Sequence, residues 1–176
     1  MKVSLVVSLV FVVCASVEAG AQSARIRALD EGAREALEEG LAGSPEFRRL
    51  ASELDESDLI VHVVSVETLP GKAAGTTLLS SSVQRHRYVR ISVLNHLAPD
   101  DRVAILGHEL QHACEIAHSR AFDTASVRSL FQSIGQRVEA TREAYETAAA
   151  IDAGTRVWHD LRRRSRRTAA KTDQEQ

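Results

Sequence analysis

The chain has 176 residues, of which 44% are hydrophobic and 26% are charged, and its formal net charge at pH 7 is −2. This length and composition predict a single domain with one sizeable core, and they exclude a fibrous or low-complexity chain. The small net charge gives no indication of a nucleic-acid partner, and none is expected.

Residues 1–21 have the pattern of a secretory signal peptide. Met1-Lys2 is a short positive region, Val3 to Ala15 is apolar except for Ser4 and Ser8, and Ala19-Gly20-Ala21 supplies small residues for cleavage. The apolar run is shorter than the roughly 18 residues that span a bilayer. We therefore expect an exported bacterial protein, periplasmic or extracellular, without a stable membrane span; a retained N-terminal anchor is the alternative. Cleavage removes Cys14 and leaves Cys114 alone, which excludes an intramolecular disulfide.

Two helices and three strands are predicted in the first half of the mature chain. Helical spacing of apolar residues predicts a helix over 23–41, and Ser44, as N-cap before Pro45, begins a second helix that closes at 55–58. The apolar, β-branched stretch 59–66 predicts a buried strand. Residues 76–82 and the alternating segment 88–93 predict two more strands.

Three helices are predicted after the strands. The first opens at Pro99 and runs to about His118, the second covers 126–134, and the third is alanine-rich and covers 139–161. Together the elements predict an α+β fold that is mainly helical. We expect the three strands to form a small antiparallel sheet that precedes the helix over 99–118.

Residues 107–113 (GHELQHA) contain the pattern H-E-x-x-H within that helix. Two histidines four residues apart lie about 40° apart around a helix, so the rings of His108 and His112 can reach one metal ion. Glu109 lies within about 100° of His108, close enough to polarise a metal-bound water. A catalytic Zn²⁺ takes three protein ligands and a water. The pattern therefore predicts a site for one Zn²⁺ ion whose third ligand lies elsewhere.

A carboxylate on the last predicted helix is the expected third ligand. Glu139, Glu143 and Glu146 fall on one face of that helix. Glu146 is preferred, because Thr147 and three alanines follow it and small side chains let two helices approach closely; Glu139 and Glu143 remain alternatives. Tyr145 is a candidate donor to a developing oxyanion.

His118 lies six residues after His112, where an extended metzincin motif would place its third ligand. No glycine between them ends the helix, and a continuous helix turns His118 about 240° away from His112. His118 is therefore not expected to bind the metal.

The two segments resemble known zinc peptidases. H-E-x-x-H followed by a downstream glutamate resembles the gluzincin-type metallopeptidases, and residues 107–113 with 145–149 resemble small uncharacterised exported bacterial zincin-like proteins. The resemblance to the small proteins extends from the 59–66 strand through the Arg-rich end. It implies a zincin-like fold, zinc ligands at His108, His112 and Glu146, and a general base at Glu109. The chain departs from typical peptidases in its small size and in lacking a visible second substrate-binding lobe.

We therefore expect residues 22–176 to be one zincin-like metallopeptidase domain that hydrolyses a peptide or protein substrate, with Glu109 as general base for a metal-activated water. The 88–93 strand is the candidate edge for pairing with an extended peptide. The alternative is an exported zincin-like protein that binds metal or a partner without turnover. A third hypothesis is that Arg162–Arg167, in a basic tail of about 162–176, binds an anionic polymer; a solvated helix end has the same composition.

Overall fold

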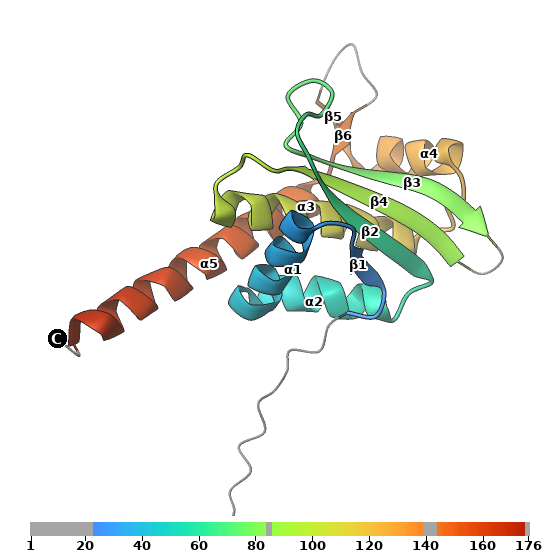
Figure 1. Ribbon diagram of the computed structural model, residues 1–176. Coiled ribbons are helices and arrows are strands. Elements are labelled where there is room, and N and C mark those ends of the chain that lie inside the picture. Colours follow the sequence, from blue (N-terminus) through green and yellow to red (C-terminus); the bar gives the residue numbers. More distant parts are fainter. Residues whose placement is uncertain (1–22, 84–85, 139–143, 175–176) are drawn as a thin grey trace, which may run out of the picture.

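The computed structural model describes residues 23–83, 86–138 and 144–174, and side chains up to residue 170. Its largest sheet has four strands in the order β1-β2-β4-β3 (Figure 1). These strands are β1 (Ile26–Ala28), β2 (Leu59–Val66), β3 (Gly75–Val83) and β4 (His86–Leu94). β1 and β4 run parallel to β2, whereas β3 runs antiparallel to β4. The fold class is therefore α+β with a mixed sheet.

The mixed sheet corrects the antiparallel one that the sequence predicted. All three predicted strands are present, but β4 lies between β2 and β3 and pairs with β2 in parallel from Leu59↔Arg87 to Val66↔Leu94. A strand's own alternation tells which side chains face the core, not the direction of its neighbour. Because β4 is an interior strand, the prediction that segment 88–93 forms a free edge is wrong. β3 occupies that edge of the sheet.

A short strand replaces the beginning of the first predicted helix. β1 pairs with β2 at Ile26↔Val61, and α1 (Glu31–Gly43) begins only after Asp30. One carboxylate oxygen of Asp30 caps α1 by accepting from the Ala33 amide at 2.9 Å, and the other accepts from the Ser65 amide in β2 at 2.7 Å. Apolar spacing alone cannot show that these residues pair with a strand 35 positions away.

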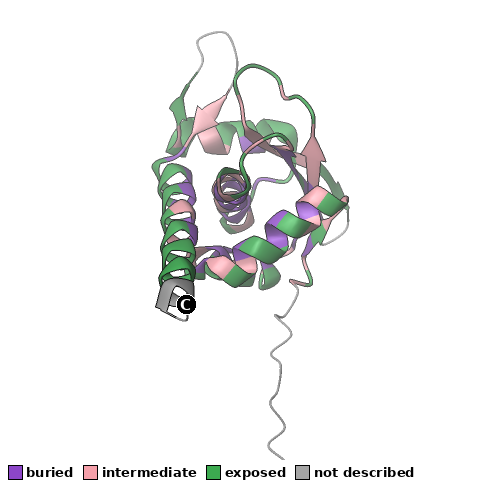
Figure 2. Ribbon diagram, turned by 60° about the vertical axis from the view of Figure 1, so that its left-hand side comes forward, coloured by how far each residue is buried: buried purple, intermediate pink, exposed green. Residues whose placement is uncertain are grey.

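Helices pack on one face of the sheet and enclose the motif helix. Val61 of β2 and Ile91 of β4 are completely buried, whereas Arg90, at the alternate position, is exposed. α3 (Pro99–His118) has the predicted bounds and contacts the sheet, α1, α2 (Pro45–Asp55) and α5 (Ala148–Gln174). It is the buried, purple helix at the centre of Figure 2. The H-E-x-x-H pattern is thus held inside the core.

Arg87 of β4 holds the C-terminal end of α3. Its guanidinium donates to the carbonyl oxygens of Ile116 at 2.7 Å, Ala117 at 3.0 Å and Ala121 at 2.8 Å. It also forms two hydrogen bonds with the Asp58 carboxylate, at 2.6 and 2.9 Å. The last carbonyls of a helix have no partner within the helix, and here one buried arginine donates to two of them, those of Ile116 and Ala117.

The chain after α4 (Thr124–Ile134) corrects the long helix predicted over 139–161. β5 (Gln136–Arg137) and β6 (Tyr145–Glu146) form an antiparallel pair, and α5 (Ala148–Gln174) begins after them. Glu146 therefore lies on a strand. The Thr147 hydroxyl accepts from the Ala150 amide at 3.1 Å, as an N-terminal helix cap does, which explains the late start of α5. Glu139 and Glu143 lie outside the described residues, as does the predicted signal peptide.

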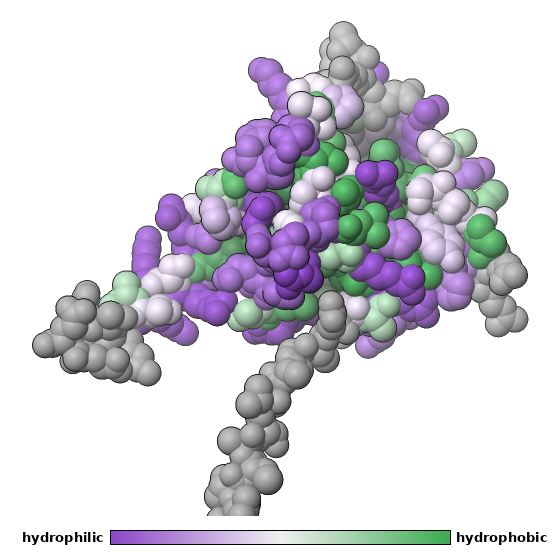
Figure 3. All heavy atoms as spheres, viewed as in Figure 1, coloured by the Kyte–Doolittle hydropathy of each residue, from purple (hydrophilic) through white to green (hydrophobic). Residues whose placement is uncertain are grey.

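The basic segment is the distal part of α5, which extends away from the sheet (Figure 1). Arg162–Arg167 are mostly exposed, and hydrophilic side chains dominate this arm in Figure 3. Arg163 pairs with Asp160, and Arg164 lies 3.1 Å from Glu39. Binding of an anionic polymer stays a hypothesis. In the part of the chain that is described, no helix has both the length and the apolarity required to cross a bilayer.

Replacing Arg87 tests whether it secures the motif helix. We expect Arg87→Met to lower the free energy of unfolding by roughly 2–3 kcal/mol, because buried carbonyl groups and Asp58 lose their donor. The exposed Arg90 on the same strand is the control, and Arg90→Met should change stability by less than about 0.5 kcal/mol. Urea unfolding of both variants measures the difference; equal stabilities would contradict this role.

Candidate metal centre

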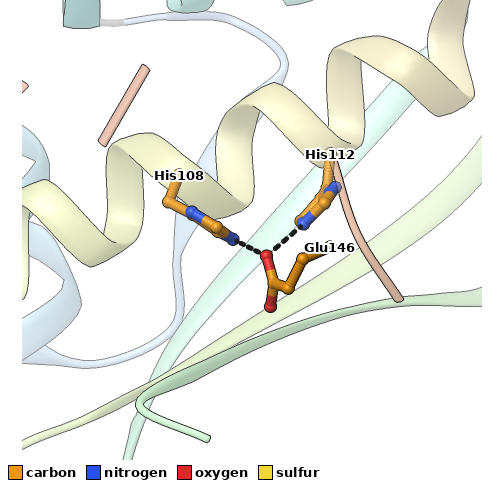
Figure 4. A group of neighbouring side chains, drawn as sticks. All are labelled: His108, His112 and Glu146. Atoms are coloured by element: carbon orange, nitrogen blue, oxygen red, sulfur yellow. Dashed lines mark ion pairs between the residues drawn. The ribbon is translucent and has the colours of Figure 1, made fainter. Parts of the chain in front are cut away.

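Three potential metal ligands converge beside α3 (Figure 4). His108 and His112 come from adjacent turns of α3, and Glu146 comes from β6. Glu146 Oε2 lies 2.7 Å from His108 Nε2 and 3.6 Å from His112 Nε2. One ligand atom from each residue lies within 4.8 Å of the other two. The structure therefore brings together the three residues that the sequence singled out as metal ligands.

The two imidazole rings are set by the helix and by packing. Their centroids are 4.9 Å apart and the ring planes make an angle of 80°. Phe131 of α4 contacts His112 edge-on, with the ring centroids 5.2 Å apart. α5 approaches the other histidine so closely that a Cβ on Gly154 would lie 3.1 Å from the Cβ of His108. Neighbouring helices therefore pack against both histidines.

The carboxylate of Glu146 fits a metal better than it fits hydrogen bonding. Its Oε2 is buried and no described residue forms a hydrogen bond of ordinary geometry with it, although His108 Nε2 lies only 2.7 Å away. The two atoms are close but not aligned as donor and acceptor. Buried oxygens without a partner are rare, and a cation between the three groups would satisfy this one. Two imidazole nitrogens and a carboxylate oxygen also form a donor set that Zn²⁺ accepts.

Opposite charges dominate the electrostatics of the cluster in the absence of metal. Burial opposes ionisation of Glu146, but the adjacent His108 and His112 outweigh it and lower the pKa of Glu146 to about 2. Burial also opposes ionisation of His112, which for a base means a lower pKa. The carboxylates of Glu115 and Glu146 beside it outweigh burial and raise the pKa of His112 to about 9. Without metal, the positive charge of the imidazolium of His112 compensates these carboxylates. A metal cation can take over this role.

Glu109 is buried on the same side of α3 as the cluster. Burial raises the pKa of Glu109, opposed by the nearby His112 and by a hydrogen bond from Thr77. The Thr77 hydroxyl, on β3, lies 2.7 Å from Glu109 Oε2. A Cβ on Gly75 would lie 2.7 Å from Oε1, so only glycine leaves space beside that oxygen. A carboxyl group with one oxygen held and a raised pKa suits a general base.

A pocket of about 360 Å³ lies beside these residues. Glu109, His112 and Glu146 line it, together with β3, α4 and Tyr145. Tyr145, the predicted oxyanion donor, is half-buried in this wall. The strand that borders the pocket is β3, in place of the 88–93 segment that was predicted to hold a peptide. Acidic, imidazole and apolar side chains thus line the same pocket.

Neither His118 nor Cys114 belongs to this cluster. His118 is 71% exposed, and its Nε2 is 3.6 Å from Glu53. The structure therefore places His118 outside the cluster of His108, His112 and Glu146. Cys114 is buried, and burial raises the pKa of its thiol, as expected for a core residue.

The sequence prediction missed three residues that contact the candidate site. Thr77 holds Glu109, Glu115 contacts His112, and Thr147 contacts Glu115. A sequence signal existed for Glu115 alone, because it follows His112 by three residues and so lies on the same helix face. The other two come from distant parts of the chain.

Comparison of the chain with protein-family models, curated proteins and solved structures found no match.

The raised pKa of His112 predicts how the stability of the metal-free protein depends on pH. A base whose pKa rises from 6.5 to about 9 on folding stabilises the protein below pH 6.5, and this stabilisation is lost as the pH rises through about 9. We expect the free energy of unfolding in the presence of a chelator to fall by roughly 2–3 kcal/mol between about pH 6 and pH 9.5.

Urea unfolding at both pH values measures this change. His112→Gln should remove most of the decrease, whereas His118→Gln, at an exposed site, should keep it. A wild-type chain equally stable at both pH values would contradict the charge arrangement described for the cluster.

Proposed function

We propose that the protein is a zinc-dependent, gluzincin-like metallopeptidase, exported to the bacterial periplasm or exterior. The observation that carries this proposal is the convergence of His108, His112 and Glu146 beside a pocket that the buried Glu109 also lines. Two histidines and a glutamate are a ligand set of catalytic zinc sites, which keep a further position open for water or substrate. The pocket supplies access to that position.

Zinc bound by these residues would polarise a substrate carbonyl and lower the pKa of a water molecule. The protein's own contribution to the reaction is made by Glu109. Because Thr77 donates to Oε2, Oε1 remains available to take a proton from water and to deliver it to the leaving amine. Tyr145, in the same pocket, is the candidate donor to the oxyanion of the substrate.

β3 is the proposed binding edge for an extended peptide or protein segment. It is the outer strand next to β4, and its residues 75–78 line the pocket. Main-chain groups on the free edge of a strand can pair with an added strand. Val127 and Phe131 of α4 contribute apolar surface to the same pocket, which favours an apolar substrate side chain there.

The second candidate function is that of a zincin-like protein that binds metal or a partner without turnover. The small number of elements around the pocket favours this non-catalytic function. β3, α4 and the segment before α5 form the walls, and the described residues include no second substrate-binding lobe. The two functions share the metal site and differ in whether Glu109 acts as a base. Separate measurements of metal binding and of hydrolysis distinguish them.

Metal analysis tests the ligand set. The mature chain should bind one equivalent of Zn²⁺, and Glu146→Ala should weaken binding by more than the roughly 10–100-fold that loss of an outer-shell partner causes. His118→Ala, which changes a histidine outside the cluster, should bind zinc as the wild type does. Full zinc occupancy in Glu146→Ala at low zinc concentration would remove Glu146 from the site.

Hydrolysis of an unfolded protein or a quenched peptide library tests the reaction. Glu109→Gln should keep zinc and lower the rate by about 10²–10⁴-fold, because the amide cannot accept the proton. Glu53→Gln, on α2 beside His118, serves as the control and should keep wild-type activity. Unchanged turnover by Glu109→Gln would exclude this mechanism, and zinc binding without turnover in the wild type would favour the second candidate function.

A further inference from the structure

Glu115 is a buried carboxylate one helical turn beyond His112. Its side chain is only 10% exposed, and its Oε2 lies 2.9 Å from His112 Nδ1. Both residues belong to α3, so the contact is built into the motif helix. A buried carboxylate is costly to keep unless its oxygens are satisfied, and this one directs an oxygen at the imidazole nitrogen that faces away from Glu146.

The other oxygen of Glu115 reaches a different part of the chain. Oε1 accepts from the Thr147 hydroxyl at 2.6 Å. Thr147 directly follows Glu146, is almost completely buried, and caps α5 by accepting from the Ala150 amide at 3.1 Å. One carboxylate therefore contacts the second histidine of the motif with one oxygen and the neighbour of Glu146 with the other.

These contacts determine which nitrogen of His112 is free. When Nδ1 carries a proton and donates to Glu115, the lone pair on neutral imidazole lies on Nε2. Nε2 is the nitrogen that faces Glu146 Oε2, at 3.6 Å. A hydrogen bond from a ligating histidine to a carboxylate also fixes the ring and increases its basicity. Glu115 thus favours the tautomer and the ring orientation that metal binding by Nε2 requires.

We propose that Glu115 is a positioning residue that sets His112 for metal binding and, through Thr147, holds the segment carrying Glu146 against α3. The inference rests on the metal site proposed above and deepens it, because it assigns the contact that aligns ligands from two separate elements. A simple packing role for Glu115 would stabilise the fold but leave metal affinity and metal geometry unchanged. Measurements of metal affinity and metal geometry therefore distinguish a positioning role from a packing role.

Zn²⁺ affinity, measured by competition with a chromophoric chelator, is the first readout. Glu115→Ala should weaken zinc binding by about 10–100-fold. Glu115→Gln should recover most of this loss, because the amide oxygen still accepts from Nδ1–H. Glu46→Ala is the matched control: the Glu46 side chain is 11% exposed and pairs with Arg49, apart from the metal site. It should lower stability without changing zinc affinity.

The link to Thr147 is tested in the same assay. Thr147→Val removes the hydroxyl and should weaken zinc binding, whereas Thr147→Ser keeps the hydroxyl and should bind as the wild type does. The effects of Glu115→Ala and Thr147→Val should not be additive, because both remove one chain of contacts. If Glu115→Ala does not fold, the zinc affinities of Thr147→Val, Thr147→Ser and Glu115→Gln still test the positioning role.

Absorption spectra of the Co²⁺-loaded proteins provide the second readout. Glu115→Ala should shift the visible bands that report ligand geometry, and Glu46→Ala should leave them unchanged. Wild-type zinc affinity and an unchanged cobalt spectrum in both Glu115→Ala and Thr147→Val would overturn the positioning role while leaving the metal site intact. Failure of the wild-type chain to bind either metal would overturn the proposed function together with this inference.

Discussion

The close approach of α5 to α3 is the contact on which the candidate site depends. At Gly154 the backbone of α5 lies so near α3 that a Cβ would come within 3.1 Å of His108 Cβ and 3.2 Å of the Ala104 carbonyl oxygen. Ala150 and Ala153 are buried on the same helix. Small side chains here allow Glu146 to reach the histidines and Thr147, the residue just before α5, to reach Glu115. Larger side chains would separate the two elements and with them the three candidate ligands.

Charge compensation is the second constraint on this region. Five ionisable groups lie within or beside two turns of α3 and are buried or half-buried: His108, Glu109, His112, Glu115 and Glu146. His112 lies between Glu115 and Glu146, which explains its raised pKa. The Thr77 hydroxyl donates to the carboxylate of Glu109, and burial raises the pKa of Glu109. Neighbouring carboxylates in such different environments suit different tasks: Glu146 suits metal ligation, and Glu109 suits proton transfer.

The sheet places this chemistry at an accessible edge. β2 and β4 occupy the interior, and β3 is the outer strand whose residues Gly75 and Thr77 contact Glu109. The same strand lines the pocket. A strand with a free edge next to a buried carboxylate and a ligand cluster is an arrangement in which an extended peptide and a base can meet. The crossover that brings β4 next to β2 therefore matters for the proposed function as well as for the fold.

The sequence by itself determined the features that depend on residues close together in the chain. The bounds of α3, the spacing of His108 and His112 on one face, and the three strand segments all follow from periodicity within a few turns or residues. The parallel pairing of β4, the strand at Glu146 and the contacts of Thr77 and Thr147 were decided only by the tertiary structure. Thr77 lies 32 residues from Glu109, and Thr147 lies 32 residues from Glu115. Such contacts depend on how whole elements pack, which local side-chain patterns do not encode.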